Sequence, residues 1–523
     1  MAGKLQLSRR RLLRSAGAYG ASLALGSVGM PFVSRAADRP LVTHGVQSGD
    51  VSLDSGVIWS RTDRASRMLV EIATSDSFRD PSHAMALDTL PDSDFTAKVL
   101  INDLPAGQDI FYRIRFQNLA YPTVTSEPVI GRFRTAPRDQ RSVSFVWSGD
   151  TAGQGWGIDV SRGGMRTYAT MLRNDPDFFV HCGDSIYADC PIERTLKLPN
   201  GETWINEVTE EKSRVAESLQ DYRGNYKYNL LDRNLRAFNA AVPTFAQWDD
   251  HEVADNWWPG QMRRDYADRS ALLLAARGRR AFAEFMPMRE TMEEPGRIYR
   301  KISYGPLLDI FMLDMRSYRG PNLNHLKSTS GPEATILGTA QLAWLKRELS
   351  RSTATWKIIA ADLPIGLISD DAIAHADGAP CGRELEIADL LSFIKRAGVR
   401  NTVWITADMH YTAAHHYDPN QAVFQDFEPF WEFVSGPIHA GTWGPSPLDN
   451  TFGPTAVYEN GCSMQQGENL APCFGLQFFG HVAIDGATQA MTVTLKDVDD
   501  RDLWSTIIAP QHDPRPSRRL SFL

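Results

Sequence analysis

Hydrophobic and polar residues follow two different patterns along the chain, and the first covers residues 41 to 136. Short apolar runs alternate there with turn sequences such as Leu104-Pro105-Ala106-Gly107. The runs that we expect to form strands are 56–60, 68–73, 96–101, 110–116 and 131–135. Short strands separated by turn signals are typical of a small immunoglobulin- or fibronectin-like sandwich. The sequence therefore predicts an all-β sandwich domain over 41–136.

From residue 141 onward, apolar runs of strand length alternate with stretches of helical periodicity. The predicted strands are 142–148, 177–182, 243–248, 307–313, 356–361, 402–407, 431–435, 478–484 and 490–496. The predicted helices are 161–174, 264–285, 339–350 and 383–397. This alternation is typical of α/β folds, so we expect a layered β-sheet core flanked by helices over residues 141–510. Few helices separate the last strands, which favours antiparallel pairing there.

Four of these apolar runs end in a carboxylate: at Asp150, at Asp184, at Asp249-Asp250 and at Asp408. A single Asp after a strand is most often a turn residue or a helix cap. Four in one domain instead predict ligands at one rim of a sheet, because strands fix the backbone while loops expose the side chains. The candidate site residues are Asp150, Asp184, Tyr187, Asp250, His251, Asp408 and His410. They indicate a metal-dependent hydrolase with two metal positions, bridged by Asp184.

Three segments carry a resemblance to a known family: Gly183-Asp184-Ser185-Ile186-Tyr187, Trp248-Asp249-Asp250-His251-Glu252 and Asp408-Met409-His410. They resemble the alkaline phosphatase D (PhoD-like) family, a branch of the calcineurin-like metallophosphoesterase superfamily. The segment His44-Gly45-Val46-Gln47-Ser48-Gly49-Asp50 resembles the opening segment of proteins in that family. The resemblance therefore covers nearly the whole chain after the first 36 residues. It implies an exported phosphoric ester hydrolase, a phosphodiesterase or alkaline phosphatase, that uses a metal-bound hydroxide at a binuclear site.

The resemblance also implies a role for each site residue. Asp184 would bridge both metals, Tyr187 would bind ferric iron as a tyrosinate, and His410 would complete the iron site. Asp250 and Asp408 would hold the second metal with Asp184. His251 would contact the phosphate and protonate or steady the leaving oxygen. In this family a Ser-Cys pair usually ends the first strand, with the Cys on iron, whereas this chain has Ser148-Gly149-Asp150. We interpret Asp150 as the substitute ligand.

The donor types indicate which metals these residues would hold. Asp184, Asp250 and Asp408 offer only oxygen, which suits Ca²⁺, Mg²⁺ or Mn²⁺ better than zinc. Binding through Tyr187 requires loss of a proton from a phenol of pKa about 10, which a trivalent ion promotes best. We therefore expect Fe³⁺ and Ca²⁺, with Mn²⁺, Mg²⁺ and Zn²⁺ left open.

Several other residues allow two interpretations. Arg316 faces the phosphate or pairs with Asp314, and His439 lines the substrate wall or is structural. His181 is expected to be a core histidine. Glu252 and Asp255 are expected to orient His251 or to lie on the rim. The polar stretch 191–240, helical in patches, is expected to be an insertion that shapes the cleft, for example as a lid.

The first 36 residues predict export by the twin-arginine translocation machinery. Ser8-Arg9-Arg10-Arg11-Leu12-Leu13 is a twin-arginine signature, and Ser34-Arg35-Ala36 is a small-x-small cleavage site. The alternative is a transmembrane anchor, which the Gly-rich, poorly apolar stretch 15–33 disfavours. The mature protein is therefore expected in the periplasm or outside the cell, without a stable membrane anchor.

The net charge and the cysteine content limit the binding partners and the disulfides that we expect. The formal net charge is −8, and cleavage after Ala36 removes six basic residues and no acid, which leaves −14. Such a surface fits neither nucleic acid nor anionic lipid. Of five cysteines, Cys462 and Cys473 are the expected disulfide pair after export. Two other functions stay open: a phospholipid-directed phosphodiesterase and a catalytically inactive cell-surface binding protein, although the intact ligand set disfavours the second.

Overall fold

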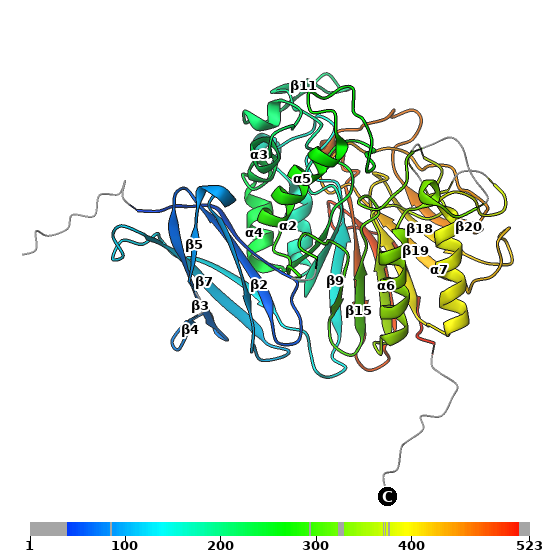
Figure 1. Cartoon of the computed structure of the whole chain (residues 1–523), viewed down its shortest axis with the longest axis horizontal. Helices are drawn as coiled ribbons and strands as arrows, with labels where there is room; N and C mark the ends of the chain where they lie inside the picture. The colour runs from blue at the N-terminus through cyan, green and yellow to red at the C-terminus, as the bar shows by residue number, and fades with distance from the viewer. Residues whose placement is uncertain are drawn as a thin grey trace, which may run out of the picture.

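The computed structural model describes residues 39–511 except 84–85, 292–293, 323–328, 370, 372 and 375–376 (Figure 1). The predicted signal peptide at 1–36 lies outside the described residues. Two large sheets face each other, and helices cover their outer faces. The predicted layered α/β core is therefore confirmed. Within the described part of the chain, no helix is long and apolar enough to cross a bilayer.

The first sheet has nine strands in the order β23-β22-β21-β9-β10-β13-β1-β2-β6. Their bounds are β23 Asp502–Ile508, β22 Met491–Asp497, β21 Phe478–Ile484, β9 Val143–Ser148, β10 Phe178–Cys182, β13 Thr244–Gln247, β1 Val42–Gly49, β2 Gly56–Thr62 and β6 Thr96–Ile101. Strands β9, β10 and β13 are parallel to one another. The predicted late strands β21 and β22 pair antiparallel, as expected, and β23, which was not predicted, also pairs antiparallel with β22.

The second sheet has seven strands in the order β14-β15-β16-β17-β19-β18-β20. Their bounds are β14 Arg300–Ser303, β15 Leu308–Met312, β16 Trp356–Ala360, β17 Thr402–Thr406, β19 Phe430–Ser435, β18 Thr412–Tyr417 and β20 Pro454–Asn460. Strands β15, β16, β17 and β19 are parallel, and the other three pair antiparallel. Strands β14, β18 and β20 of this sheet were not among the predicted strands, nor were β1 and β23 of the first sheet and the short pair β11 Thr195–Lys197 and β12 Thr203–Ile205. Strand β20 alternates between half-buried and exposed positions, which gives only a weak apolar signal.

Alternating side chains on each strand explain the layers. On β9, Phe145 and Trp147 lie in the core between the two sheets, whereas Val146 lies under the outer helices. On β16, Ile358 lies in the same central core and Ile359 lies under helices of the opposite face. Period-two alternation of buried residues on both faces is what a sheet covered on both sides requires.

Six α-helices cover these outer faces within the described residues. Over the first sheet lie α2 Arg166–Arg173, α3 Leu219–Asn229, α4 Arg233–Ala241 and α5 Ala271–Phe285; over the second lie α6 Gly338–Arg351 and α7 Glu384–Ala397. Two predicted starts were too early. Helix α5 begins at 271 rather than 264 because the Ser270 side chain caps it by accepting the Leu273 amide. Helix α2 follows a separate 3-10 turn at Val160–Arg162.

The N-terminal part is all-β, as predicted, but one of its layers continues the first large sheet. The opposing layer consists of β3 Ser66–Ala73, β4 Ser82–His83, β5 Leu87–Thr89, β7 Asp109–Asn118 and β8 Val129–Arg134. Strand β1 pairs in parallel with β13 at Gly49 and Thr244. A Cβ at Gly49 would lie 2.4 Å from the Thr244 carbonyl oxygen, so only glycine allows this approach.

A buried ion pair fixes the same junction. Asp50 Oδ1 accepts a hydrogen bond from Arg300 Nη2 at 2.6 Å, and Asp50 Oδ2 accepts one from the Arg289 amide at 2.8 Å. The Asp50 and Arg300 side chains are 1% and 9% exposed. The motif 44–50, which the sequence analysis connected with family identity, therefore has a structural role in joining the two parts of the protein.

Replacing Asp50 by alanine should lower the free energy of unfolding by about 3–5 kcal/mol, because Arg300 would stay buried without its partner. Urea denaturation followed by circular dichroism measures this change. The control is Asp88→Ala, which breaks a solvent-exposed pair with Arg67 and should leave the midpoint nearly unchanged. Equal midpoints for Asp50→Ala and the wild type would show that the pair does not stabilise the junction.

Candidate metal centre

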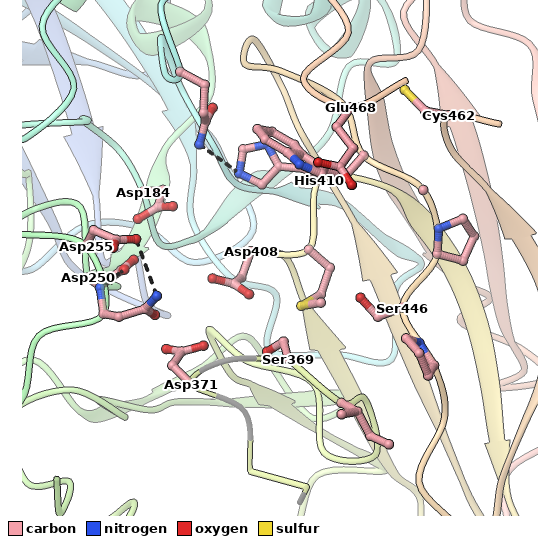
Figure 2. Close-up of a pocket in the computed structure, with 18 of the residues that line it drawn as sticks. Asp184, Asp250, Asp255, Ser369, Asp371, Asp408, His410, Ser446, Cys462 and Glu468 are labelled. Atoms are coloured by element: carbon pink, nitrogen blue, oxygen red, sulfur yellow. Dashed lines mark hydrogen bonds between the residues drawn. The ribbon is translucent and has the colours of Figure 1, made fainter. Parts of the chain in front are cut away.

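The loops after four parallel strands bring the predicted ligands to one rim. Asp150 follows β9, Asp184 follows β10, Asp250 follows β13 of the first sheet, and Asp408 follows β17 of the second. Figure 2 shows Asp184, Asp250, Asp408 and His410 around one pocket. The structure brings these strand ends together, but from two facing sheets rather than from one rim of a single sheet.

Four of these residues have a left-handed backbone. The φ angles are 68° at Asp150, 54° at Asp184, 64° at Asp408 and 57° at His410. Non-glycine residues adopt this region at an energetic cost, and such strain concentrates at functional sites. The strand ends thus hold these side chains in orientations that an unconstrained loop would seldom sample.

The first donor group consists of Asp150, Asp184 and His410, whose ligand atoms lie within 4.8 Å of one another. Tyr187 Oη lies 2.8 Å from His410 Nε2, and His410 Nδ1 lies 2.5 Å from the Gly441 carbonyl oxygen. Nδ1 therefore carries the proton, and Nε2 keeps its lone pair for the site. Burial lowers the pKa of His410 to about 3, so the imidazole is neutral.

The second donor group consists of Asp184, Asp250 and Asp408, together with Asp249. Asp250 Oδ2 accepts the Asn256 amide at 2.6 Å, while its buried Oδ1 has no hydrogen-bond partner in the described structure. Asp249 Oδ1 instead accepts a hydrogen bond from Arg316 Nε at 2.5 Å. Asp184 belongs to both groups.

The pKa shifts of these acids agree with a site that binds cations. Burial, reinforced by the charge of Asp249, raises the pKa of Asp150 and of Asp408 well above the usual carboxyl range. Burial also raises the pKa of Asp184 and that of the Tyr187 phenol. Both buried oxygens of Asp150 lack hydrogen-bond partners in the described structure. Buried carboxylates without donors are costly unless a cation neutralises them, so the donor set fits two metal ions.

His251 lies at the edge of the second group, held by an acid that the sequence analysis left out. Its Nδ1 is 2.7 Å from Asp189 Oδ1, and Asp189 Oδ2 accepts the Asp255 amide at 2.5 Å. Burial lowers the pKa of His251, but Asp189, Asp250 and Asp184 outweigh burial and raise that pKa well above its usual range. The only sequence signal for Asp189 was its position two residues after Tyr187.

Glu252 does not orient His251, contrary to one of its two expected roles. Its carboxylate accepts hydrogen bonds from the amides of Asp249 and Ser185 at 2.8 and 2.6 Å and from the Ser185 hydroxyl at 2.6 Å. Burial raises its pKa to about 7. Glu252 therefore ties the loop after β10 to the loop after β13.

The Arg316 side chain forms neither of its two expected contacts, and only its main-chain amide donates to Asp314 Oδ1, at 3.2 Å. Arg316 is fully buried, does not line the pocket, and directs its side chain to Asp249 and Asp371 rather than to Asp314. Asp314 instead accepts the Trp248 indole N–H at 2.9 Å. His439 bonds the Gly157 carbonyl oxygen and is structural, and His181 is a buried core residue as predicted.

The pocket at this rim has a volume of about 960 Å³. Beyond the donor groups, its walls include residues 443–447 together with Ile368, Ser369, Asp371, Cys462, Ser463, Met464, Gly467 and Glu468. None of the residues 191–240, all of which the structure describes, lines it, so their expected role in shaping the cleft was wrong. That stretch contains α3 and α4, which lie against α5, α2 and β1 instead. Helix α4 is exposed on one side, whereas α3 is buried around most of its surface, its polar residues included.

The predicted disulfide is also wrong. Cys462 and Cys473 are free, as are the other three cysteines. Cys462 lines the pocket and donates its thiol proton to the Thr442 carbonyl oxygen at 3.1 Å. Cys473 lines a separate pocket with Arg162 and His439. A loop of ten intervening residues thus directs the two thiols to different places.

Comparison with known proteins agrees with this geometry. A family model described as PhoD-like phosphatase matches residues 145–495, and one described as the N-terminal domain of PhoD-like phosphatase matches 27–137. The chain belongs to the PhoD-like phosphatase family. It is 27% identical over 469 residues to alkaline phosphatase D of Bacillus subtilis (strain 168), covering 83% of this chain and 75% of that protein.

Two solved structures share the fold of this PhoD-like phosphatase. The structure of PhoD superposes with a TM-score of 0.66 at 22% identity, covering 90% of this chain and 89% of that one. A purple acid phosphatase, PPD1 from seeds of yellow lupin (Lupinus luteus), superposes with a TM-score of 0.56 at 12% identity, covering 90% and 74%. The architecture is therefore shared at low sequence identity.

Proposed function

We propose that this PhoD-like phosphatase is an exported, metal-dependent phosphoric ester hydrolase with a binuclear site. The observation that carries the proposal is the pair of donor groups that share Asp184 within one pocket. Asp150, Asp184, Tyr187 and His410 would hold Fe³⁺, and Asp184, Asp250 and Asp408 would hold Ca²⁺. Mn²⁺, Mg²⁺ and Zn²⁺ are the other occupants to test.

Two bound cations would supply an activated water and neutralise charge on the phosphoryl oxygens. The protein residues then position the ester and move a proton. Asp189 holds Nδ1 of His251, so the imidazolium presents Nε2–H as the proton donor to the leaving oxygen. Asp184 and Asp189 thus have distinct roles: Asp184 binds the metals, and Asp189 orients the acid.

The pocket lining supports a site that binds phosphate through cations and His251. No Lys or Arg is among its described lining residues, whereas Asp255, Asp371 and Glu468 add negative charge. Trp443, Met409 and Pro445 provide apolar wall area beside His410. A substrate anion would be repelled from this pocket without bound metal.

Removal and restoration of metal test the proposal directly. Chelation should abolish hydrolysis of bis-p-nitrophenyl phosphate and p-nitrophenyl phosphate, and iron plus Ca²⁺ should restore it. Elemental analysis should find iron, and a visible tyrosinate-to-iron absorption band should accompany it. A folded protein that is inactive on both esters under every metal condition would instead support the binding-protein alternative.

A Gly153→Ala variant tests the role of Tyr187 without touching a ligand. A Cβ at Gly153 would lie 2.6 Å from the Tyr187 ring, so the ring must move. We expect the visible band to shift or weaken and the iron content to fall. Gly331→Ala is the control, since nothing lies within 4 Å of a Cβ there. An unchanged band in Gly153→Ala would contradict Tyr187 as an iron ligand.

We also propose export through the twin-arginine pathway, which rests on the sequence of residues 1–36 alone. Folding before export would allow iron and Ca²⁺ to bind under cytoplasmic control. The proposed units are the signal peptide at 1–36, the sandwich at 41–136 and the catalytic domain at 141–510.

A further inference from the structure

Arg316 is a buried cation surrounded by acids behind the second donor group. Its side chain is 0% exposed. Nε donates to Asp249 Oδ1 at 2.5 Å and lies 3.7 Å from Asp362 Oδ2, and Nη1 donates to Asp371 Oδ2. The guanidinium is thereby held on two of its edges by side chains that are not among the proposed ligands.

The third nitrogen of Arg316 faces the proposed ligands. Nη2 lies 3.7 Å from Asp250 Oδ1 and 3.9 Å from Asp408 Oδ1. Both Nη2 and Asp250 Oδ1 are buried and have no hydrogen-bond partner in the described structure. A guanidinium nitrogen and a cation between Asp184, Asp250 and Asp408 would therefore share the same two carboxylates.

We propose that Arg316 sets the affinity and charge selectivity of the second cation site, an inference that rests on the proposed binuclear function. A fixed positive charge beside the Asp250–Asp408 pair repels a second cation and weakens its binding. At separations of a few ångströms inside a protein, one unit charge changes ion affinity by roughly one to several powers of ten. The second site is therefore an exchangeable divalent site rather than a permanently loaded one.

The positive charge of Arg316 also favours ions of different valence at the two metal sites. A trivalent ion meets a repulsion one and a half times that met by a divalent ion at the same distance. The structure records no ion pair between Arg316 and Asp150 or Asp184 within the described residues. Arg316 thus disfavours Fe³⁺ at Asp250 and Asp408 and leaves the group around Asp150 as the trivalent site.

Ca²⁺ titration of the full-length, chelator-treated protein by calorimetry tests this inference without using activity. Arg316→Gln should bind Ca²⁺ roughly tenfold or more tightly than the wild type. Its melting temperature without Ca²⁺ should fall, and the rise on adding Ca²⁺ should grow. Arg319→Gln is the matched control, because Arg319 is equally buried and pairs with Asp371 at 3.1 Å but with none of the proposed ligands. Its Ca²⁺ affinity should match the wild type.

Should Arg316→Gln fail to fold, Arg316→Met removes the same charge while keeping an apolar side chain in the buried position, and it should also bind Ca²⁺ more tightly. Equal or weaker Ca²⁺ binding in a folded variant would overturn the proposal, since Arg316 would then only position the acids. A wild-type protein that binds no Ca²⁺ would overturn it as well. Ester hydrolysis by that protein would show that the proposed function survives.

Discussion

Asp184→Asn is expected to lose both bound metals and to reduce ester hydrolysis roughly a thousandfold or more. The reason is geometric, because Asp184 belongs to both donor groups and is buried at their junction. An amide keeps the size of the side chain but offers only one neutral oxygen, so it cannot bridge two cations. Elemental analysis, the visible absorption band and turnover of bis-p-nitrophenyl phosphate measure the three consequences together.

The control for this variant is Asp177→Asn, at the opposite end of the same strand. Asp177 is also buried, and its Oδ2 accepts the Ser144 amide at 2.9 Å before β10 begins. This variant should lose some thermal stability but keep its metal and its turnover. Near-normal metal content and turnover in Asp184→Asn would rule out the bridging role.

Asp189→Asn is expected to lower kcat roughly a hundredfold or more while leaving the metal content intact. An asparagine cannot stabilise the His251 imidazolium, and its amide can impose the wrong tautomer on Nδ1. Because Asp189 raises the pKa of His251, its loss lowers that pKa. The protonated form is then lost at lower pH, so the alkaline limb of the kcat profile should move to lower pH.

Asp159→Asn separates this effect from simple loss of a buried acid. Asp159 is buried and accepts hydrogen bonds from the amides of Ser161 and Ile205, away from the pocket. It should leave the pH profile in place. If the alkaline limb of the kcat profile did not shift in Asp189→Asn, His251 would not be the proton donor.

The candidate metal-binding residues could be predicted because each one follows a strand within a few residues. Asp150 and Asp184 follow parallel strands of the first sheet, which gathers such positions at one rim, whereas Asp408 reaches the site from the second sheet. The sequence feature that identified these positions is local: an apolar run followed by an acid. These residues converge because of the order of the strands in the sheets, and not because of which residues lie between the strands.

Contacts made across the fold were not predictable in this way. Asp189 and His251 are 62 residues apart, and Arg316 reaches Asp249 across 67 residues. No repeating pattern in the sequence links residues that lie so far apart. The sequence therefore suggested two contacts for the Arg316 side chain, phosphate and Asp314, and the side chain forms neither. The pocket walls at 443–447 and 462–468 lie on irregular loops, where hydrophobic patterning carries no information.

The N-terminal layer shows a similar limit. Five of its strands were predicted from alternation but β1 was not, and the pairing of Gly49 with Thr244 depends on a close approach that no local pattern encodes. The sequence therefore suggested a separate sandwich where the structure has a shared sheet.

The strand order of the first sheet has a consequence for how the protein is made. Strand β9, which delivers Asp150, pairs with β21, whose register places Val143 beside Ile484. A ribosome must therefore synthesise more than 300 further residues before β9 gains this neighbour. Such distant pairing slows folding, because the chain loses entropy in closing a long loop before the contact forms. The candidate metal centre is accordingly expected to be among the last parts of the molecule to become complete during biosynthesis.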